Sequence, residues 1–354
     1  RGQPDPVDGA LCLACILPSG YTRTLLPAYG KEPTAPDLPL FGYAAVAFRG
    51  ERLYCAAVRT EQNPRWDPRQ YHRSDLAARL ERRLKASPEN RVLRQLAVCA
   101  TEYGCYNAQN VFYGRWEGAV PVSPACNAVC RGCISLQPDD LPPSPQQRFD
   151  FVPTLEEIVE VGLAHLVHPE AIYSFGQGCE GEPLLRADLI ARSIRAMRAE
   201  TDRGCLHLNT NASRPAGLRA VVAAGLDSIR ISLNSVLPRI YTAYYQPRNY
   251  TFEDVAECAR ISREGGLQLC LNYLQMPGWN DVEEEVDALL DFLDEHQVDQ
   301  VQMRNLNIDP DLYAGWVERP GGRTLGIPEL IRRIRTHCPR VRIGNHTAFF
   351  QRSR

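Results

Sequence analysis

The sequence predicts an α/β protein: a partial (β/α)6 barrel, TIM-like in plan, that follows a small α+β domain. Two observations support this prediction. After about residue 120, short apolar or β-branched runs alternate regularly with amphipathic segments, which is typical of a parallel sheet with crossover helices. Before that point the chain has a different texture, with a hairpin pattern and charged helices. We therefore expect an N-terminal α+β domain over residues 1–118 and the barrel with a C-terminal extension over 119–354.

The N-terminal part contains two kinds of local pattern. Residues 40–59 predict two strands joined by a tight turn at Arg49-Gly50-Glu51. Charged helices are expected at 74–86, where Ser74 or Asp75 is the cap, and at 88–102. The apolar stretch 110–122 reads as strand. Together these elements suit a small domain that presents a substrate or a partner to the barrel.

The barrel pattern gives six βα steps, counting a strand just before Cys126. The further strands are expected at 171–175, 205–210, 228–233, 268–274 and 299–304. The helices between them are expected near 154–167, 184–199, 214–224, 251–264 and 281–296, with a last helix near 326–337 and a short strand at 340–343. Thr154 and Glu157 have the spacing of a capping box, which fixes the start of the first of these helices.

Composition excludes several classes of function. The 354-residue chain is 44% hydrophobic and 23% charged, as in ordinary soluble globular proteins. A formal net charge of -2 argues against a nucleic-acid partner. The apolar piece at 10–17 is too short to cross a bilayer and lacks the flanks of an export signal, so we expect no membrane association. The 13 cysteines are odd in number and scattered, which favours the reducing cytoplasm over a disulfide scaffold.

Three cysteines form a compact group in "PACNAVCRGCISLQ" at 124–137. Cys126, Cys130 and Cys133 have the spacing C-x3-C-x2-C, and no fourth cysteine or histidine follows nearby. Structural zinc requires four closed ligands, whereas a [4Fe–4S] cluster on three thiolates leaves one iron open to a small molecule. A zinc knuckle with a remote fourth ligand is the alternative. Cys12, Cys15, Cys99 and Cys105 leave a second metal site open, although a buried cysteine is also simply a small hydrophobe.

Polar residues follow the ends of the predicted strands. The carboxyl ends of parallel strands meet on one rim, where barrel enzymes place their reactive loops. Asparagine favours turns, so each asparagine alone is unremarkable. Together with the cysteine triplet they predict a ligand cavity, and the residues that approach this rim are Asn209, Asn211, Asn234, Asn272 and Arg304.

With "GEP" at 181–183 and "PGWND" at 277–281, the triplet resembles the radical S-adenosylmethionine (radical SAM) superfamily over about residues 119–310. The resemblance implies a [4Fe–4S] cluster whose open iron binds S-adenosylmethionine (SAM). It also implies reductive cleavage of SAM to a 5′-deoxyadenosyl radical that removes hydrogen from a substrate. It further implies an electron donor such as a flavodoxin or a ferredoxin.

The resemblance assigns roles residue by residue. Cys126, Cys130 and Cys133 would bind the cluster, and Gly181, Glu182 and Pro183 would receive the methionyl ammonium. Further cofactor contacts would come from the ends of later strands, at Asn209, Asn211, Ser232, Asn234 and Arg304. Cys179, within the loop before "GEP", is a candidate catalytic hydrogen-atom donor. The chain departs from the family at Gly132, where an aromatic residue usually covers the adenine.

Two functional classes follow from these residues. The first is a radical SAM enzyme acting on an unidentified substrate, with the N-terminal domain slightly favouring a peptide or a protein. The second is a non-catalytic iron–sulfur or zinc-binding protein, or sensor, on the same barrel. Cleavage of SAM by the reduced protein distinguishes the two classes.

Overall fold

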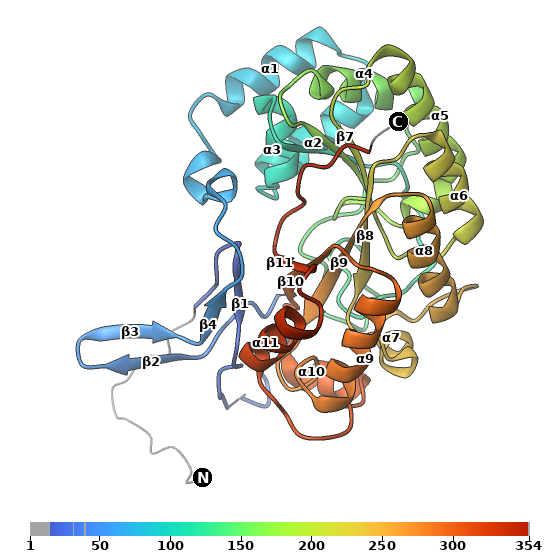
Figure 1. The fold of residues 1–354 in the computed structure, drawn as a ribbon. Helices are drawn as coiled ribbons and strands as arrows, with labels where there is room; N and C mark the ends of the chain where they lie inside the picture. The colour runs from blue at the N-terminus through green and yellow to red at the C-terminus, as the bar shows by residue number, and fades with distance from the viewer. Residues whose placement is uncertain (1–14, 31, 39, 353–354) are drawn as a thin grey trace.

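A computed structural model describes residues 15–30, 32–38 and 40–352 of the chain. A parallel sheet of seven strands, in the order β11-β10-β9-β8-β7-β6-β5, forms its centre. These strands are β5 (Glu117–Val120), β6 (Ile172–Phe175), β7 (Cys205–Thr210), β8 (Ser228–Leu233), β9 (Gln268–Gln275), β10 (Gln300–Asn305) and β11 (Arg342–Gly344). Neighbours in the sheet are neighbours along the chain, and every adjacent pair is parallel, so the sheet is an open barrel of repeated βα steps (Figure 1).

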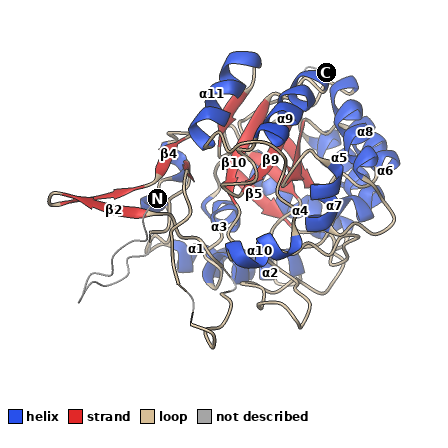
Figure 2. Ribbon diagram, turned by 90° about the horizontal axis from the view of Figure 1, so that it is seen from below, coloured by secondary structure: helices blue, strands red, loops and turns tan. Residues whose placement is uncertain are grey.

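Helices cover one side of this sheet (Figure 2). They are α4 (Leu155–Leu166), α5 (Ala187–Glu200) after the short 3-10 helix η3 (Pro183–Arg186), α6 (Pro215–Ala224), α8 (Phe252–Glu264), α9 (Glu283–Glu295) and α11 (Ile327–His337). The predicted capping box of α4 is present: the Thr154 side chain accepts from the Glu157 N–H, and the Glu157 carboxylate accepts from the Thr154 N–H. Two further helices on the rim, α7 (Pro238–Tyr245) and α10 (Pro310–Trp316), were not predicted.

Strand β8 shows how the two faces of the sheet differ. Ile229, Ile231 and Leu233 point toward the helices and are fully buried in one continuous hydrophobic core. Burying each such side chain contributes about 1.5–3 kcal/mol. The residues between them, Arg230 and Ser232, face the inside of the barrel and are partly exposed. The apolar alternate positions therefore hold the barrel wall together, and the polar ones line its interior.

The N-terminal helices pack directly against the first elements of the barrel. Helices α1 (Leu76–Ala86), α2 (Arg91–Thr101) and α3 (Tyr106–Tyr113) share one hydrophobic core with α4 and β5. The hairpin of β2 (Val46–Arg49) and β3 (Arg52–Cys55) is where it was predicted and extends away from the barrel (Figure 1). The strand prediction for 110–122 is wrong in its first half. Ala108 and Phe112, one helical turn apart, are buried in the core, so packing overrides the local β-propensity until Gly114 ends α3.

Two segments close the open barrel. Strand β1 (Tyr21–Arg23) pairs with β4 (Ala57–Arg59) and attaches to the end of β10, where the Arg23 N–H donates to Asn305 Oδ1 at 2.9 Å. The C-terminal segment crosses the opposite end of the sheet, where the Arg352 N–H donates to Asp227 Oδ1 at 3.3 Å. Trp66, the last residue of the 3-10 helix η1 (Pro64–Trp66), stacks on the His346 ring with the ring centres 4.6 Å apart; a second 3-10 helix, η2 (Pro68–Gln70), follows. The rim at the carboxyl ends of the strands, lower in Figure 1, carries α7, α10 and the loop with the three cysteines.

Candidate cofactor site

The cysteine loop leaves β5 at the rim formed by the carboxyl ends of the strands and is held by the loop after β6. The Gly181 N–H donates to Ser123 O at 2.7 Å, and the Glu182 N–H donates to Ala125 O at 2.8 Å. A Cβ at position 181 would lie 2.0 Å from Ala125 O, far inside van der Waals contact. Only glycine permits this approach, so the "GEP" element fixes the backbone just before Cys126.

Two buried carboxylates strengthen this junction. Glu182 accepts from the Leu184 N–H at 2.9 Å, from the Asn211 N–H at 2.8 Å and from the Thr210 hydroxyl. Burial raises its pKa to about 7, and these hydrogen bonds oppose the rise. The carboxylate therefore ties the loops after β6 and β7 together.

Glu180 does the same for the cysteine loop and was missed from the sequence. Its carboxylate accepts from the Val122 N–H at 2.8 Å, the Ser123 N–H at 2.9 Å and the Gln177 N–H at 2.7 Å. Burial raises the pKa of Glu180 to about 8. The sequence feature that could have predicted this role is its position two residues before Glu182, in "CEGEP". Carboxylates at alternate positions of a tight loop can accept hydrogen bonds from backbone N–H groups.

The far side of the cysteine loop rests on the end of α7. The Val129 N–H donates to Tyr245 O and the Arg131 N–H to Tyr244 O, each at 3.0 Å. This contact explains the departure at Gly132. A Cβ there would meet Ile308 Cδ1 at 2.3 Å and the Tyr244 hydroxyl at 2.8 Å. The space beside the third cysteine is filled from α7 and from the loop after β10, two elements that the sequence did not connect with it.

The three thiols are partly exposed on this single loop. Burial raises the pKa of Cys126 to about 11, helped by the negative charge of Glu182. Burial also raises the pKa of Cys130 well above its ordinary value, and the charges of Cys133 and Cys126 add to the rise. The negative charge of one thiolate therefore disfavours ionisation of the next thiol. A bound cation offsets this electrostatic cost.

The loop offers the kind of donor that a cluster needs. Among the residues that the structure describes, no group of three His, Cys, Asp or Glu side chains is arranged to hold a metal ion. In a [4Fe–4S] cluster each thiolate binds a different iron. Arg148 Nη2 also donates to Cys133 Sγ at 3.3 Å, and such a donor suits a cluster-bound sulfur. The residues present fit a cluster held by Cys126, Cys130 and Cys133.

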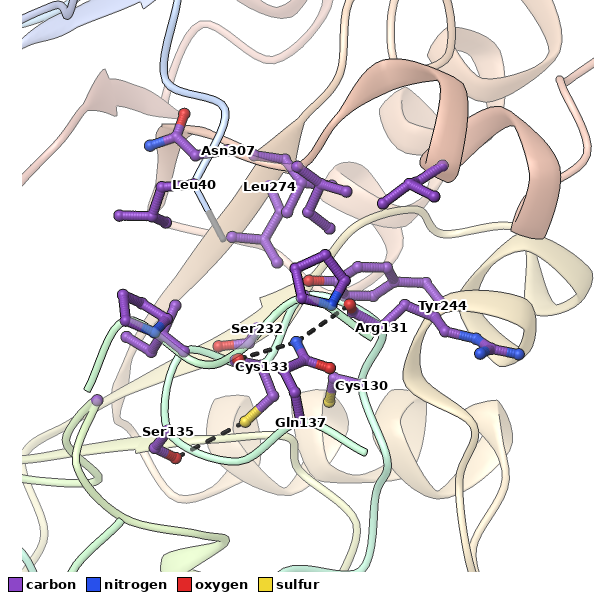
Figure 3. A pocket seen from close by; sticks show the side chains of 18 of the residues that line it. Leu40, Cys130, Arg131, Cys133, Ser135, Gln137, Ser232, Tyr244, Leu274 and Asn307 are labelled. Atoms are coloured by element: carbon purple, nitrogen blue, oxygen red, sulfur yellow. Dashed lines mark hydrogen bonds between the residues drawn. The ribbon is translucent and has the colours of Figure 1, made fainter. Parts of the chain in front are cut away.

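A hollow of about 330 Å³ lies directly beside this loop, as Figure 3 shows. Cys130, Gly132 and Cys133 form one wall, and Leu274, Asn305 and Ile308 come from the opposite strands and loops. The N-terminal segment contributes Leu38 and Leu40, and α10 contributes Trp316. Arg131 extends over the Trp316 ring, 5.3 Å from its centre. The hollow is thus mostly apolar, with amide and hydroxyl groups among its lining residues.

The predicted cofactor residues have different positions. Ser232 lines the hollow and accepts from Asn272 Nδ2 at 3.3 Å. Asn211 contacts the cysteine loop through Asn127, whereas Asn209 bonds to His207 and to Phe175 O. Asn234 is buried against Tyr313. Pro183 is the first residue of η3. Arg304 lies inside the barrel, where it donates to Gln302 Oε1. The structure therefore brings the triplet, the "GEP" loop and Ser232 together, and places the others around them.

The remaining candidate cysteines lie in two places. Cys179 is buried, and its thiol contacts the Cys99 thiol of α2 instead of lining the hollow. Cys105 packs near the same pair. The Cys15 thiol contacts Cys55 at the end of β3. Cys12 lies outside the described residues. A catalytic role for Cys179 stays a prediction. Of the cysteines considered for a second metal site, Cys15 contacts Cys55, whereas Cys99 contacts Cys179.

Comparison with known proteins settles the family. The model of the radical SAM superfamily matches residues 120–293, which include the whole cysteine loop and the "GEP" element. The chain belongs to the radical SAM superfamily. Membership implies a [4Fe–4S] cluster and SAM as cofactors, as expected from the triplet.

Individual relatives of this radical SAM protein are more distant. It is 28% identical to the GTP 3′,8-cyclase of Streptomyces coelicolor over 235 residues, which is 63% of this chain and 62% of that protein. The chain thus spans less than two thirds of that relative. Among solved structures it is similar to SuiB of Streptococcus suis bound to S-adenosylmethionine, with a TM-score of 0.44 and 12% identity over 72% of this chain and 55% of that one.

A second solved structure is similar to a comparable extent. HydG, a maturase of the [FeFe]-hydrogenase, has a TM-score of 0.45 and 13% identity over 76% of this chain and 65% of that one. No helix in the described part of the chain has the length and apolar character needed to cross a bilayer.

Proposed function

We propose that this protein is a radical SAM enzyme that removes a hydrogen atom from a substrate held in the hollow beside the cysteine loop. The observation that carries the proposal is the loop itself: three partly exposed thiols lie on one segment, and an apolar hollow lies against it. When bound, the cluster and SAM supply a 5′-deoxyadenosyl radical by one-electron cleavage of the sulfonium. A flavodoxin or a ferredoxin is the proposed electron donor.

The chain's own residues would bind, orient and shield. Cys126, Cys130 and Cys133 would each bind one iron, and Arg148 would donate to a bound sulfur. Gly181 and Glu182 support a positioning role, since both hold the loop backbone. Direct contact of SAM with Glu182, Asn209 or Asn234 stays a prediction.

The walls of the hollow support water exclusion. Leu38 and Leu40 come from the N-terminal segment, and Ile308 and Trp316 from the barrel. Exclusion of water protects a reactive carbon radical from side reactions. A peptide or protein remains among the proposed substrates, and it would enter past this N-terminal segment.

The test is anaerobic reconstitution followed by reduction with dithionite in the presence of SAM. We expect about four irons and four sulfides per chain and formation of 5′-deoxyadenosine, detected by mass spectrometry. Cys130→Ala should lose both, whereas Cys55→Ala, a partly exposed cysteine of the hairpin, should keep both. An intact cluster that never yields 5′-deoxyadenosine would instead support the non-catalytic sensor, and stoichiometric zinc would support the zinc site.

A further inference from the structure

The inside of the barrel is polar in successive layers, which is unusual. The pairing register places Asn209, Arg230, Cys270 and Gln300 in one layer and Ser232, Asn272 and Gln302 in the next. Leu274 and Arg304 form the layer nearest the hollow. Barrels that are filled by their own side chains use Val, Ile and Leu at such positions. A polar interior with partly exposed groups indicates space for a polar ligand.

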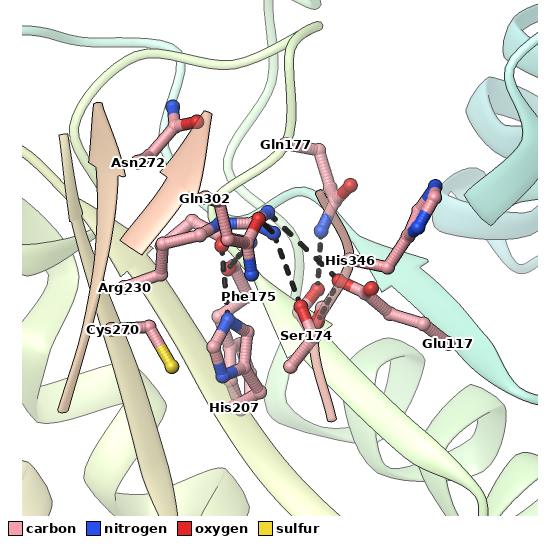
Figure 4. Close-up of polar contacts among 12 residues, drawn as sticks. Glu117, Ser174, Phe175, Gln177, His207, Arg230, Cys270, Asn272, Gln302 and His346 are labelled. Atoms are coloured by element: carbon pink, nitrogen blue, oxygen red, sulfur yellow. Dashed lines mark hydrogen bonds and ion pairs between the residues drawn. The ribbon is translucent and has the colours of Figure 1, made fainter. Parts of the chain in front are cut away.

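Two guanidinium groups converge in this interior on a single neutral acceptor. Arg230 Nη1 donates to Gln302 Oε1 at 2.8 Å, and Arg304 Nη2 donates to the same oxygen at 3.3 Å. Figure 4 shows Arg230 lying between Gln302 and Glu117. The Glu117 carboxylate is 4.0 Å from Arg230 Nη2 and already accepts from the Ser174 hydroxyl at 2.8 Å. The guanidinium groups of Arg230 and Arg304 thus donate to one neutral amide oxygen, which does not neutralise their positive charges.

The charges nearby do not complete the compensation. Burial lowers the pKa of Arg304 to about 10, and the charge of Arg230 contributes. Burial, with the same Arg230 charge, lowers the pKa of His207 to about 4, so that histidine is neutral. The next carboxylate, Glu61, accepts from the backbone N–H groups of Asn345 and His346. Two partly buried cations therefore face two carboxylates, Glu117 and Glu61, and both of these carboxylates already accept hydrogen bonds from other groups.

Unused donors accompany these cations. Arg230 Nε and Gln302 Nε2 are buried and have no hydrogen-bond partner among the described residues. Leaving a buried donor of a charged group unsatisfied is costly, and an oxyanion satisfies several such donors at once. A carboxylate or a phosphate group has the charge and the oxygens to bind both guanidinium groups.

The position of the pair also points to a ligand. Leu274, the register partner of Arg304, and Asn305, the next residue on β10, line the hollow, so Arg304 lies directly behind its wall. The opposite end is closed, since the Thr347 hydroxyl accepts from Arg230 Nη1 at 3.1 Å. A molecule that enters from the rim would therefore place one end against the arginines and the other beside the cysteine loop.

We propose that Arg304 and Arg230 form an oxyanion subsite for the substrate, which is a compound with a carboxylate or phosphate group. The substrate assignment rests on the proposed function; the anion site itself does not. Bound there, the anion would fix the distance of the substrate from the cofactors. The assignment differs from a contact of Arg304 with the carboxylate of SAM, which the family resemblance implies.

The test measures thermal unfolding of the full chain, without a cluster, in rising concentrations of inorganic phosphate and, separately, of acetate. Sodium chloride holds the ionic strength constant. We expect at least one of the two anions to raise the melting temperature in a saturable manner. Arg304→Gln should raise the half-saturating concentration by about tenfold or more. Arg335→Gln on α11, an exposed arginine, should leave it unchanged.

Further arms keep the test decisive. Arg304→Lys retains the positive charge and should bind the same anion as the unaltered protein with weaker affinity. This variant provides the test if Arg304→Gln does not fold. The stronger of the two anions identifies phosphate or carboxylate. The proposal is overturned if neither anion exceeds chloride, or if Arg335→Gln loses the response as Arg304→Gln does. It is also overturned if Arg304→Gln weakens SAM binding by the reconstituted protein while its phosphate and acetate responses persist. Absence of 5′-deoxyadenosine with anion binding intact would count against the proposed function and not against the site.

Discussion

Arg148 and Cys133 are joined by a hydrogen bond from the guanidinium Nη2 to Sγ, 3.3 Å long, while Arg148 Nε donates to Ser135 Oγ at 3.2 Å. The guanidinium is thus held in place by two partners from the cysteine loop. A positive donor on a cluster-bound sulfur stabilises the reduced, more negative cluster. Arg148 lies outside the cysteine motif, yet it would tune the reduction potential of a cluster bound at Cys133, on which cleavage of SAM depends.

Replacing Arg148 should lower the reduction potential of the cluster. Arg148→Gln removes the charge, and we expect a shift to more negative potential on the order of several tens of millivolts. Redox titration followed by electron paramagnetic resonance measures it. Arg195→Gln, an exposed arginine on α5, is the control and should not shift the potential. An unchanged potential in Arg148→Gln would show that this hydrogen bond does not reach the cluster.

Gly181 should tolerate no side chain. Gly181→Ala places a Cβ against Ala125 O and must displace the cysteine loop. We expect a loss of about 1–3 kcal/mol in the free energy of unfolding and a lower iron content after reconstitution. Gly315→Ala on α10 meets no atom within 4 Å and should be neutral or slightly stabilising. Urea unfolding and iron analysis check both variants, and full iron occupancy in Gly181→Ala would contradict the proposed role of "GEP".

Buried acids should make stability fall as pH rises through the weakly acidic range. Burial raises the pKa of Glu285 to about 7, although Tyr273 Oη and the Val236 N–H donate to it at 2.7 and 3.1 Å. The unfolded chain releases this proton near pH 4.3 and the folded chain only near pH 7. The contribution of Glu285 to the free energy of unfolding is therefore fully present below about pH 4. It is lost as the pH rises from about 4.3 to about 7, and the loss amounts to up to about 3 kcal/mol.

The variant Glu285→Gln isolates that contribution. Its free energy of unfolding should fall less between pH 5 and pH 7 than that of the unaltered protein, because the neutral amide does not titrate. Urea unfolding at several pH values measures the difference. Glu102→Gln, at an exposed position, should keep the original pH dependence. Identical slopes for Glu285→Gln and the unaltered protein would refute a raised pKa at Glu285.

Arg23 should act as the clamp that holds the N-terminal segment on the barrel. It is 1% exposed, and its guanidinium donates to Phe41 O at 3.1 Å and to Leu306 O. Arg23→Met leaves these carbonyls unpaired, and we expect a loss of roughly 3 kcal/mol. Hydrogen exchange should become faster around Phe41, next to Leu40 in the wall of the hollow. Arg59→Met, exposed on β4, should change neither quantity, and unchanged exchange in Arg23→Met would exclude the clamp.

Sequence patterns predicted the elements that depend on neighbouring residues. The period of the barrel strands, the capping box at Thr154 and the hairpin turn at Gly50 all follow from interactions a few residues apart, and all were found. Helix α3 was mistaken for strand because Val111 and Phe112 have high β-propensity, while the burial that decides their conformation comes from α2 and β5.

By itself, the sequence predicted the family and the barrel, and both were found; it also proposed Cys126, Cys130 and Cys133 as cluster ligands. The spacing of the three cysteines and the alternation of strands and helices are local properties of the chain. Only the tertiary structure decided what surrounds them: Tyr244 and Ile308 beside Gly132, Glu180 on the loop backbone, and Arg230 with Arg304 on Gln302. These contacts join residues from different strands and loops, and no local preference records them. They depend on the sheet register and on how the barrel is closed, which the chain as a whole establishes.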